Sequence, residues 1–179
     1  MIVVVIVGVL AALAVYGTRK YIISSKTSEA TQMLGSIKSA QEVFFSDNMT
    51  YLDVSGGHAL NDLSTFYPTS TPGKAKWAWG GGTGAIPDAW RALNVKTDGG
   101  GLYFTYGCAA GAVGDAVAAP GIAVFNKSVL PTVTNWPTAV NGPWYVAKAV
   151  ADLDGDGNDS TTYVAASFTE QIFGGSNGE

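Results

Sequence analysis

Residues 1–16 have the sequence MIVVVIVGVLAALAVY, an uncharged apolar run at the start of the chain. At about 1.5 Å per residue, a helix of this length is about 24 Å long, somewhat shorter than the roughly 30 Å hydrocarbon core of a membrane. A secretory signal places basic residues before a shorter apolar stretch, whereas Arg19 and Lys20 follow this run. The run therefore predicts a helix that stays in the mature protein. Cleavage behind Ala12 or Ala14 is the alternative.

A helical pattern continues beyond this run to about Asp47, without a proline. Apolar residues recur at a spacing of three and four, which is typical of an amphipathic helix with one buried face. This stripe holds Ile22, Ile23, Ala30, Met33, Leu34, Ile37, Ala40, Phe44 and Phe45, with the polar Gln41 on the same face. The opposite face is predicted to be solvated surface, and it holds Lys20, Lys26, Glu29, Gln32, Lys38 and Glu42. Together the two parts predict one helix of about 45 residues and about 70 Å.

The composition changes after this helix, because all 7 prolines and nearly all of the 23 glycines lie beyond it. Aromatic and β-branched residues between turn signals indicate strands. We expect an α+β fold in which the second half of the helix packs on an antiparallel sheet of about four strands. The expected strands are residues 102–108 (LYFTYGC), 144–151 (WYVAKAVA) and 161–168 (TTYVAASF), with 121–125 as a weaker candidate.

Three parts follow from this division of the chain. Residues 1–17 form an apolar half-helix, residues 18–48 an amphipathic half-helix, and residues 49–179 a β-rich head. Within the head we expect long surface loops at 53–95 and 109–141. The tail 174–179 is predicted to be disordered.

Residues 1–13 (MIVVVIVGVLAAL) and residues 29–45 (EATQMLGSIKSAQEVFF), followed by Thr50 and Tyr51, carry a resemblance to a known family. They resemble the N-terminal segment and the second helix half of type IV pilins and of the related type II secretion pseudopilins. The resemblance implies the pilin fold and a structural subunit that polymerises into a pilus. It gives the role of filament assembly to Met1, Ile2, Val3, Val4, Val5, Ile6, Val7, Gly8, Val9, Leu10 and Leu13.

The resemblance also implies partners and a location. Identical subunits would surround the apolar half-helix in the filament, after a stage in the bacterial inner membrane. Prepilin peptidase and the pilus assembly machinery would act on the chain. In the family, the peptidase cuts a leader before a methylated residue, usually Phe, and a glutamate follows in a run such as F-T-L-I-E-L. We therefore expect the natural protein to have these residues before Met1.

The chain departs from the family near Tyr16. Pilins commonly have a proline near the position of Tyr16, whereas this chain has Tyr16-Gly17 there and keeps Gly8. Each interior glycine lowers helix stability by about 1 kcal/mol relative to alanine. We predict that the stretch between Gly8 and Gly17 unwinds when subunits pack into the filament. The alternative is that both glycines only permit close approach of helices.

Cys108 is the single cysteine, so the intrachain disulfide of many pilins is absent. Within a predicted strand, it is expected to be a small buried residue rather than a reactive thiol.

Residues 152–160 (DLDGDGNDS) match the front of a calcium-binding loop, with Asp at positions one, three and five and Gly at position six. Position twelve is Tyr163, where an EF-hand has a glutamate. The segment predicts a hairpin turn, since Asp-Gly favours turns. Calcium bound in the same turn is compatible with this, and its ligands would be Asp152, Asp154, Asp156 and Asp159.

Other functions find little support in the composition. A net charge of −4, with 10 basic residues, argues against direct binding of nucleic acid. The sequence has one histidine, His58, and none of the motifs G-x-S-x-G, H-E-x-x-H or C-x-x-C, so we do not expect an enzyme. The alternatives to a major pilin are a pseudopilin or minor pilin and, in another class, a membrane-anchored binding or enzymatic domain. Whether the filament serves motility, adhesion or secretion is not indicated by any motif.

Overall fold

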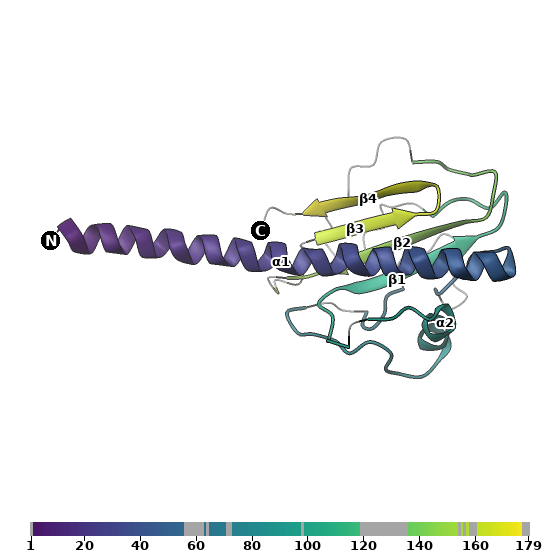
Figure 1. Ribbon diagram of the computed structural model, residues 1–179, viewed down its shortest axis with the longest axis horizontal. Coiled ribbons are helices and arrows are strands. Elements are labelled where there is room, and N and C mark those ends of the chain that lie inside the picture. The colour runs from purple at the N-terminus through teal and green to yellow at the C-terminus, as the bar shows by residue number, and fades with distance from the viewer. Residues whose placement is uncertain are drawn as a thin grey trace.

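The computed structural model describes residues 2–55, 63, 65–70, 73–97, 99–118, 136–153, 155, 157 and 161–176, with the side chains of all of these except 19, 20, 23 and 176. It is an α+β structure in which a long helix packs on a four-stranded antiparallel sheet of order β1-β2-β3-β4 (Figure 1). The expected fold class is therefore confirmed. The elements are α1 (Ile2–Asn48), α2 (Ala85–Leu93), β1 (Thr105–Gly111), β2 (Trp144–Ala151), β3 (Thr161–Ala166) and β4 (Thr169–Ser176).

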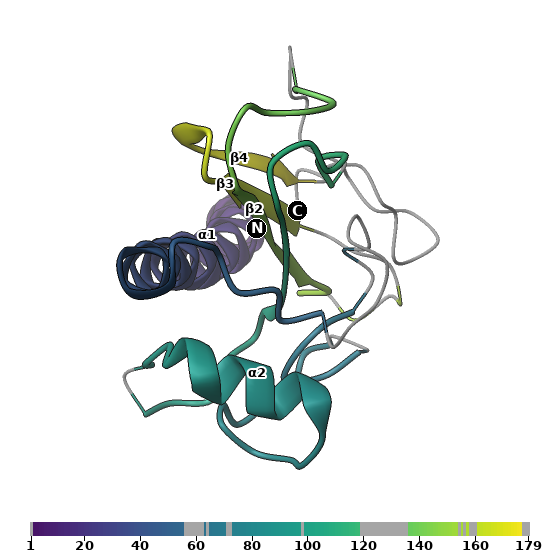
Figure 2. The ribbon, with the colours of Figure 1, turned by 90° about the vertical axis from the view of Figure 1, so that its right-hand side faces the viewer.

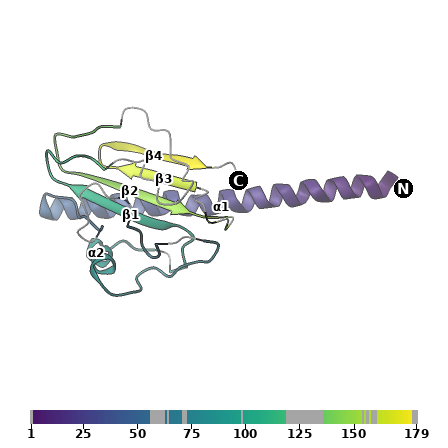
Figure 3. The same ribbon diagram turned by 180° about the vertical axis from the view of Figure 1, so that it is seen from behind.

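Only the second half of α1 packs against the head. Ala30, Leu34 and Ile37 are fully buried and lie in the main core with Met33. The first half projects from the head as a single straight rod, which Figures 1 and 3 show from opposite sides. The expected continuation of one helix through both halves is thus confirmed.

Strands β1, β2 and β3 are buried on both faces, which explains why most of their residues are apolar or small. The face toward α1 presents small residues of β2 and β3, among them Ala147, Ala149 and Ala165, and this lets the helix approach closely. The other face holds a second cluster around Trp144 and Val164. The sheet therefore forms the middle layer between α1 and the chain behind it.

A second helix lies in the segment 53–95, where we expected only a surface loop (Figure 2). Trp90 and Leu93 of α2 are buried against the core, and α2 contacts α1. The helix ends at Leu93 and is capped by Asn94, whose φ of 56° is left-handed and whose N–H donates to the Arg91 carbonyl at 3.0 Å. Asn tolerates this conformation, which commonly ends helices. The loop prediction was wrong here because nine residues sufficed for a packed helix.

The predicted strands differ from the observed ones mainly at their ends. The first begins at Thr105 rather than 102, because Leu102 instead pairs with Trp77 in an isolated bridge. The second is confirmed at Trp144–Ala151, and the third ends at Ala166, before a tight turn. The fourth strand is β4, so residues 174–176 are ordered and their predicted disorder was wrong. The candidate strand 121–125 and residues 177–179 lie outside the described residues.

Candidate functional site

The apolar half of α1 is the most distinctive surface of the protein. Its large side chains are between 53% and 77% exposed, and they lie on every side of the helix. A helix that is apolar all round requires cover from lipid or from other helices. The exposed residues are Ile2, Val3, Val4, Val5, Ile6, Val7, Val9, Leu10, Leu13, Val15 and Tyr16. All expected assembly residues with large side chains belong to this set except Met1, which lies outside the described residues.

No helix in the described part of the chain combines the length and the apolar character needed to span a membrane.

Gly8 and Gly17 both lie within continuous α-helix in the single chain. A Cβ added at either position would meet nothing within 4 Å. Neither glycine is therefore needed for packing inside the subunit. Their predicted unwinding concerns the assembled filament and stays a prediction.

Glu29 fastens α1 to the head near the point where the head begins. Its Oε1 atom accepts hydrogen bonds from the backbone N–H groups of Tyr103 at 2.8 Å and of Phe104 at 3.1 Å. The ammonium groups of Lys26 and Lys76 lie over the Tyr103 ring, 4.4 and 4.9 Å from its centroid. Burial raises the pKa of the Glu29 carboxyl, while the two backbone hydrogen bonds and the two lysines oppose this shift. The carboxyl thus joins helix and head at the cost of partial desolvation.

Gln41 makes the second attachment, in the buried interior. The side-chain Nε2 donates to the Leu52 carbonyl at 2.7 Å, and the Leu52 N–H donates to Oε1 at 3.0 Å. Nε2 also lies 3.3 Å from Cys108 Sγ in β1. Because Gln41 is fully buried, this pairing satisfies a polar group that would otherwise destabilise the core. It also fixes the course of the chain as it leaves α1.

Lys38 makes the third attachment. Its ammonium donates to the carbonyl oxygens of Thr169 at 2.8 Å and Glu170 at 3.4 Å, at the start of β4. Its side chain is half-buried. The helix is therefore attached to both edge strands of the sheet, since Gln41 contacts β1 and Lys38 contacts β4.

The predicted solvated face of α1 was wrong for Lys26, Glu29 and Lys38, which are half-buried at the head. Gln32 and Glu42 are exposed as expected, and the side chain of Lys20 is not described. The charged residues at 29 and 38 border the apolar stripe on either side, and this spacing is the signal that could have placed them at the interface. The exposed face of the second helix half instead carries mainly small uncharged residues: Ser24, Ser25, Ser28, Thr31, Gly35 and Ser39.

Cys108 is buried and free of disulfides, as expected. Burial raises the pKa of its thiol to about 12, although the hydrogen bond from Gln41 lowers it. The thiol is therefore protonated at neutral pH and is not a nucleophile.

The aspartate-rich segment connects β2 and β3, which are antiparallel neighbours, so the predicted hairpin turn is confirmed. Asp152 is buried, and its two carboxylate oxygens accept hydrogen bonds from the N–H groups of Gly155 at 2.6 Å and Gly157 at 3.1 Å. Both glycines have positive φ, which explains why glycine occupies these positions. The Asp152 carboxylate thus orders the turn by accepting hydrogen bonds from the backbone of the turn.

The remaining proposed calcium ligands, Asp154, Asp156 and Asp159, lie outside the described residues, as does His58. Among the described residues, no group of three His, Cys, Asp or Glu side chains is arranged to hold a metal. Calcium binding therefore stays a prediction.

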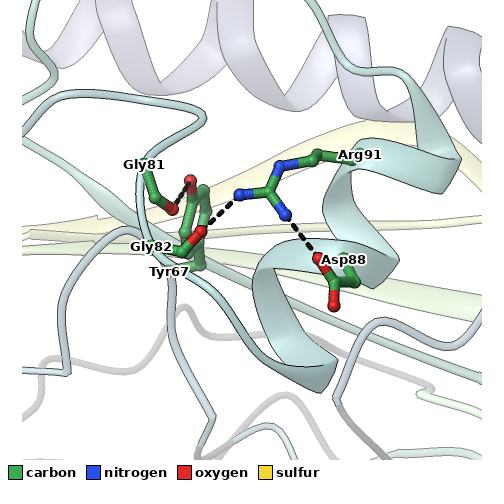
Figure 4. Close-up of polar contacts among 5 residues, drawn as sticks. All are labelled: Tyr67, Gly81, Gly82, Asp88 and Arg91. Carbon is green, nitrogen blue, oxygen red and sulfur yellow. Dashed lines mark hydrogen bonds and ion pairs between the residues drawn. The ribbon is translucent and has the colours of Figure 1, made fainter.

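The glycine run 80–82 has a structural role in the head (Figure 4). The Tyr67 hydroxyl donates to the Gly81 carbonyl at 2.8 Å, and the Arg91 guanidinium donates to the Gly82 carbonyl and pairs with Asp88. The Gly81 and Gly82 carbonyls thus accept hydrogen bonds from protein donors, and the loop is held against α2.

Comparison of the chain with protein-family models, with curated proteins and with solved structures found no match.

Proposed function

We propose that this protein is a structural subunit, the major pilin, of a type IV pilus. The observation that carries the proposal is the exposed apolar half of α1, which extends as continuous helix from a well-packed head. The motif resemblance of residues 1–13 and 29–45 to pilins points in the same direction. In this proposal the fold is the pilin fold.

The physical basis of assembly is burial of apolar surface. Each Å² of apolar area removed from water contributes about 25 cal/mol, and the apolar half-helices of many copies would bury one another in a common core. Before assembly the same residues would be covered by lipid in the bacterial inner membrane. Transfer from lipid to the filament gains little from the hydrophobic effect, so an energy-consuming assembly machine would drive it. Prepilin peptidase would process the chain, and its new terminus would be methylated.

The attachments of α1 favour this function over a membrane-anchored binding or enzymatic domain. A tether ends in a flexible linker, whereas α1 runs unbroken from Ile2 to Asn48 and is fixed to the head through Glu29, Lys38 and Gln41. These attachments fix the position of the head relative to the helix. A type II secretion pseudopilin or a minor pilin shares these features and remains the alternative within the class.

Electron microscopy of surface material tests the proposal. Cells that carry the intact gene should yield filaments on shearing, and cells without the gene should yield none. Filaments that react along their whole length with antibody to the head identify a major subunit, whereas labelling only at tips identifies a minor one. A Leu10→Arg variant that reaches the membrane fraction should form no filaments, because Leu10 is 59% exposed in the single chain and the charge would be buried without a partner in the filament core. Unchanged filaments in the deletion strain would contradict the proposal.

A further inference from the structure

Two hollows adjoin on the head, beside α2 and the glycine run 80–82. The first has a volume of about 320 Å³, and the second has a volume of about 440 Å³. They share Tyr67 and Pro87, and together they are called the α2 cleft below. Figure 4 shows the Arg91 side chain extending from α2 toward the glycine run at this place. Both volumes fall within the range of about 300–1,000 Å³ that is typical of small-ligand sites.

Aromatic rings line the first hollow. The Trp79 ring lies edge-to-face against Tyr67 and against Trp90, with centroids 4.8 and 5.2 Å apart. The Tyr67 hydroxyl donates to the Gly81 carbonyl at 2.8 Å. The Trp79 indole N–H donates to the Val95 carbonyl at 3.1 Å. These contacts fix the rings within the subunit, so the aromatic surface is formed before any ligand arrives.

The second hollow adds an exposed ring. Trp77 lines this hollow and is 41% exposed, and it is the one exposed aromatic residue among the described residues beyond α1. Its backbone is fixed by two hydrogen bonds with Leu102, each of 2.8 Å. The indole is therefore held at the surface, where its apolar face is available to a ligand.

The charges at the α2 cleft are balanced. Arg91 is the one charged side chain among the described residues that line it, and this guanidinium pairs with Asp88. A guanidinium has five N–H donors, so Arg91 retains donors beyond its bonds to Asp88 and Gly82. The exposed Asn94 amide, which also lines the first hollow, can both donate and accept. Because Asp88 repels anions and Arg91 repels cations, the site favours a neutral ligand with donors and acceptors.

A sugar ring in the pyranose form has these properties. The C–H groups on its face pack against the electron-rich face of an aromatic ring, and its hydroxyl groups each donate and accept hydrogen bonds. We propose that the α2 cleft binds a neutral oligosaccharide. One sugar ring lies in the first hollow against the aromatic wall, with its hydroxyls bonded to Arg91 and Asn94. The neighbouring sugar ring stacks on Trp77 in the second hollow.

Titration of the purified full chain with neutral oligosaccharides tests the proposal. The probes are maltopentaose, cellopentaose and chitopentaose, and the protein is kept in a detergent without a sugar headgroup. Tryptophan fluorescence and saturation-transfer NMR measure binding. At least one probe is expected to bind with a Kd of about 1 mM or lower. Binding of none of them would overturn the proposal, and so would binding of decaproline in place of every sugar, since that would assign the cleft to a proline-rich peptide.

Two variants locate the bound sugar. Trp77→Ala removes the exposed ring, and Asn94→Gly removes only the amide, because glycine adopts a φ of 56° without strain. Each is expected to weaken binding by about fivefold or more. Tyr21→Ala is the control, since it removes a ring that is 77% exposed on α1, outside the cleft, and it should leave the affinity unchanged. Thermal melts that match the wild type show that the variants are folded.

Each remaining outcome decides the proposal. Wild-type affinity in either cleft variant, or equal weakening by Tyr21→Ala, would overturn it. Because the titration uses separate subunits, its result is independent of the filament assay. Filaments without sugar binding would leave the proposed function standing, and sugar binding without filaments would leave the α2 cleft standing.

Discussion

Gln41 and Leu52 bond to each other twice, since the Gln41 amide donates to the Leu52 carbonyl at 2.7 Å and accepts the Leu52 N–H at 3.0 Å. The Gln41 side chain thus pairs with both backbone groups of Leu52, as the backbone of a neighbouring strand would. A Gln41→Leu substitution should lower the free energy of unfolding by about 1–3 kcal/mol, because it leaves both backbone groups without this partner. Urea unfolding of the detergent-solubilised full chain, followed by tryptophan fluorescence, measures the change. Gln171→Leu, on the exposed side of β4, serves as the control and should have an effect of less than about 0.5 kcal/mol. Equal effects of the two variants would contradict the role of Gln41.

Glu29 should make stability depend on pH. Burial raises the pKa of its carboxyl in the folded protein above the ordinary value of 4.5, so folding favours the protonated form. The contribution of this group to stability is therefore full below about pH 4.5 and is lost as the pH rises through the folded pKa. Urea unfolding of wild type and Glu29→Gln from pH 3.5 to pH 7 should show the wild type losing stability relative to the variant over that rise. Glu170→Gln, at an exposed position, provides the control for the exchange of a carboxylate for an amide. A difference that is constant with pH would contradict the prediction.

Gly111 should not accept a side chain. A Cβ at this position would lie 2.5 Å from Cζ2 of Trp144, its partner across the β1–β2 pair. Gly111→Ala should therefore lower the unfolding free energy by about 1–3 kcal/mol through overpacking. Gly35→Ala, in the middle of α1 with nothing within 4 Å, should instead raise it by about 1 kcal/mol. The opposite signs should be visible in thermal melts, and a stabilising Gly111→Ala would show that Trp144 moves aside freely.

The glycines of the apolar half should matter for assembly rather than for the subunit. A Gly8→Ala, Gly17→Ala double variant should gain helix stability, about 1 kcal/mol at each site, and should form fewer filaments because unwinding becomes harder. Circular dichroism and quantification of sheared filaments measure the two effects. Gly142→Ala, in open space within the head, is the control and should leave both unchanged. Continuous helical hydrogen bonding from residue 8 to residue 17 in the wild-type filament would contradict the unwinding.

Calcium should bind in the turn between β2 and β3. Calorimetric titration of the full chain with millimolar calcium should release or absorb heat, and Asp154→Asn with Asp156→Asn should remove that signal because carboxylate oxygens are the preferred ligands. Asp47→Asn, at an exposed position of α1, should leave it unchanged. A wild-type titration without heat, together with no calcium-dependent rise in the melting temperature, would exclude the site.

The parts of the fold that follow from periodicity could be predicted from the sequence. The stripe at Ala30, Leu34 and Ile37 indicated both the length of α1 and its buried side. β2 was located at both ends because Trp144–Ala151 is a run of apolar and aromatic residues interrupted only by Lys148. β4 was missed because Gly174 and Gly175 resemble a flexible tail. In the sheet, the Tyr163 ring lies over Gly174 at the paired position and supplies the packing that the glycine lacks.

The attachment of α1 to the head depended on contacts that sequence spacing does not reveal. Glu29 reaches backbone N–H groups 74 and 75 residues away, and Lys38 reaches carbonyls 131 and 132 residues away. These partners are backbone groups, so no complementary residue marks them in the sequence. For α2, Asp88 near the start, Arg91 in the last turn and Asn94 after it are the local signals that could have identified the helix.

The three attachments of α1 also determine how the subunit would respond to mechanical load. Glu29, Lys38 and Gln41 extend over about 18 Å of the helix, and the strands run roughly along it (Figure 1). A pull on the apolar half, directed along the rod, would therefore stress all three joints at once in shear, together with the apolar interface between them. Contacts loaded in parallel break only when the applied force exceeds their combined strength. The head would therefore stay attached to α1 under a shear force that would be large enough to break the same contacts if they were loaded one after another.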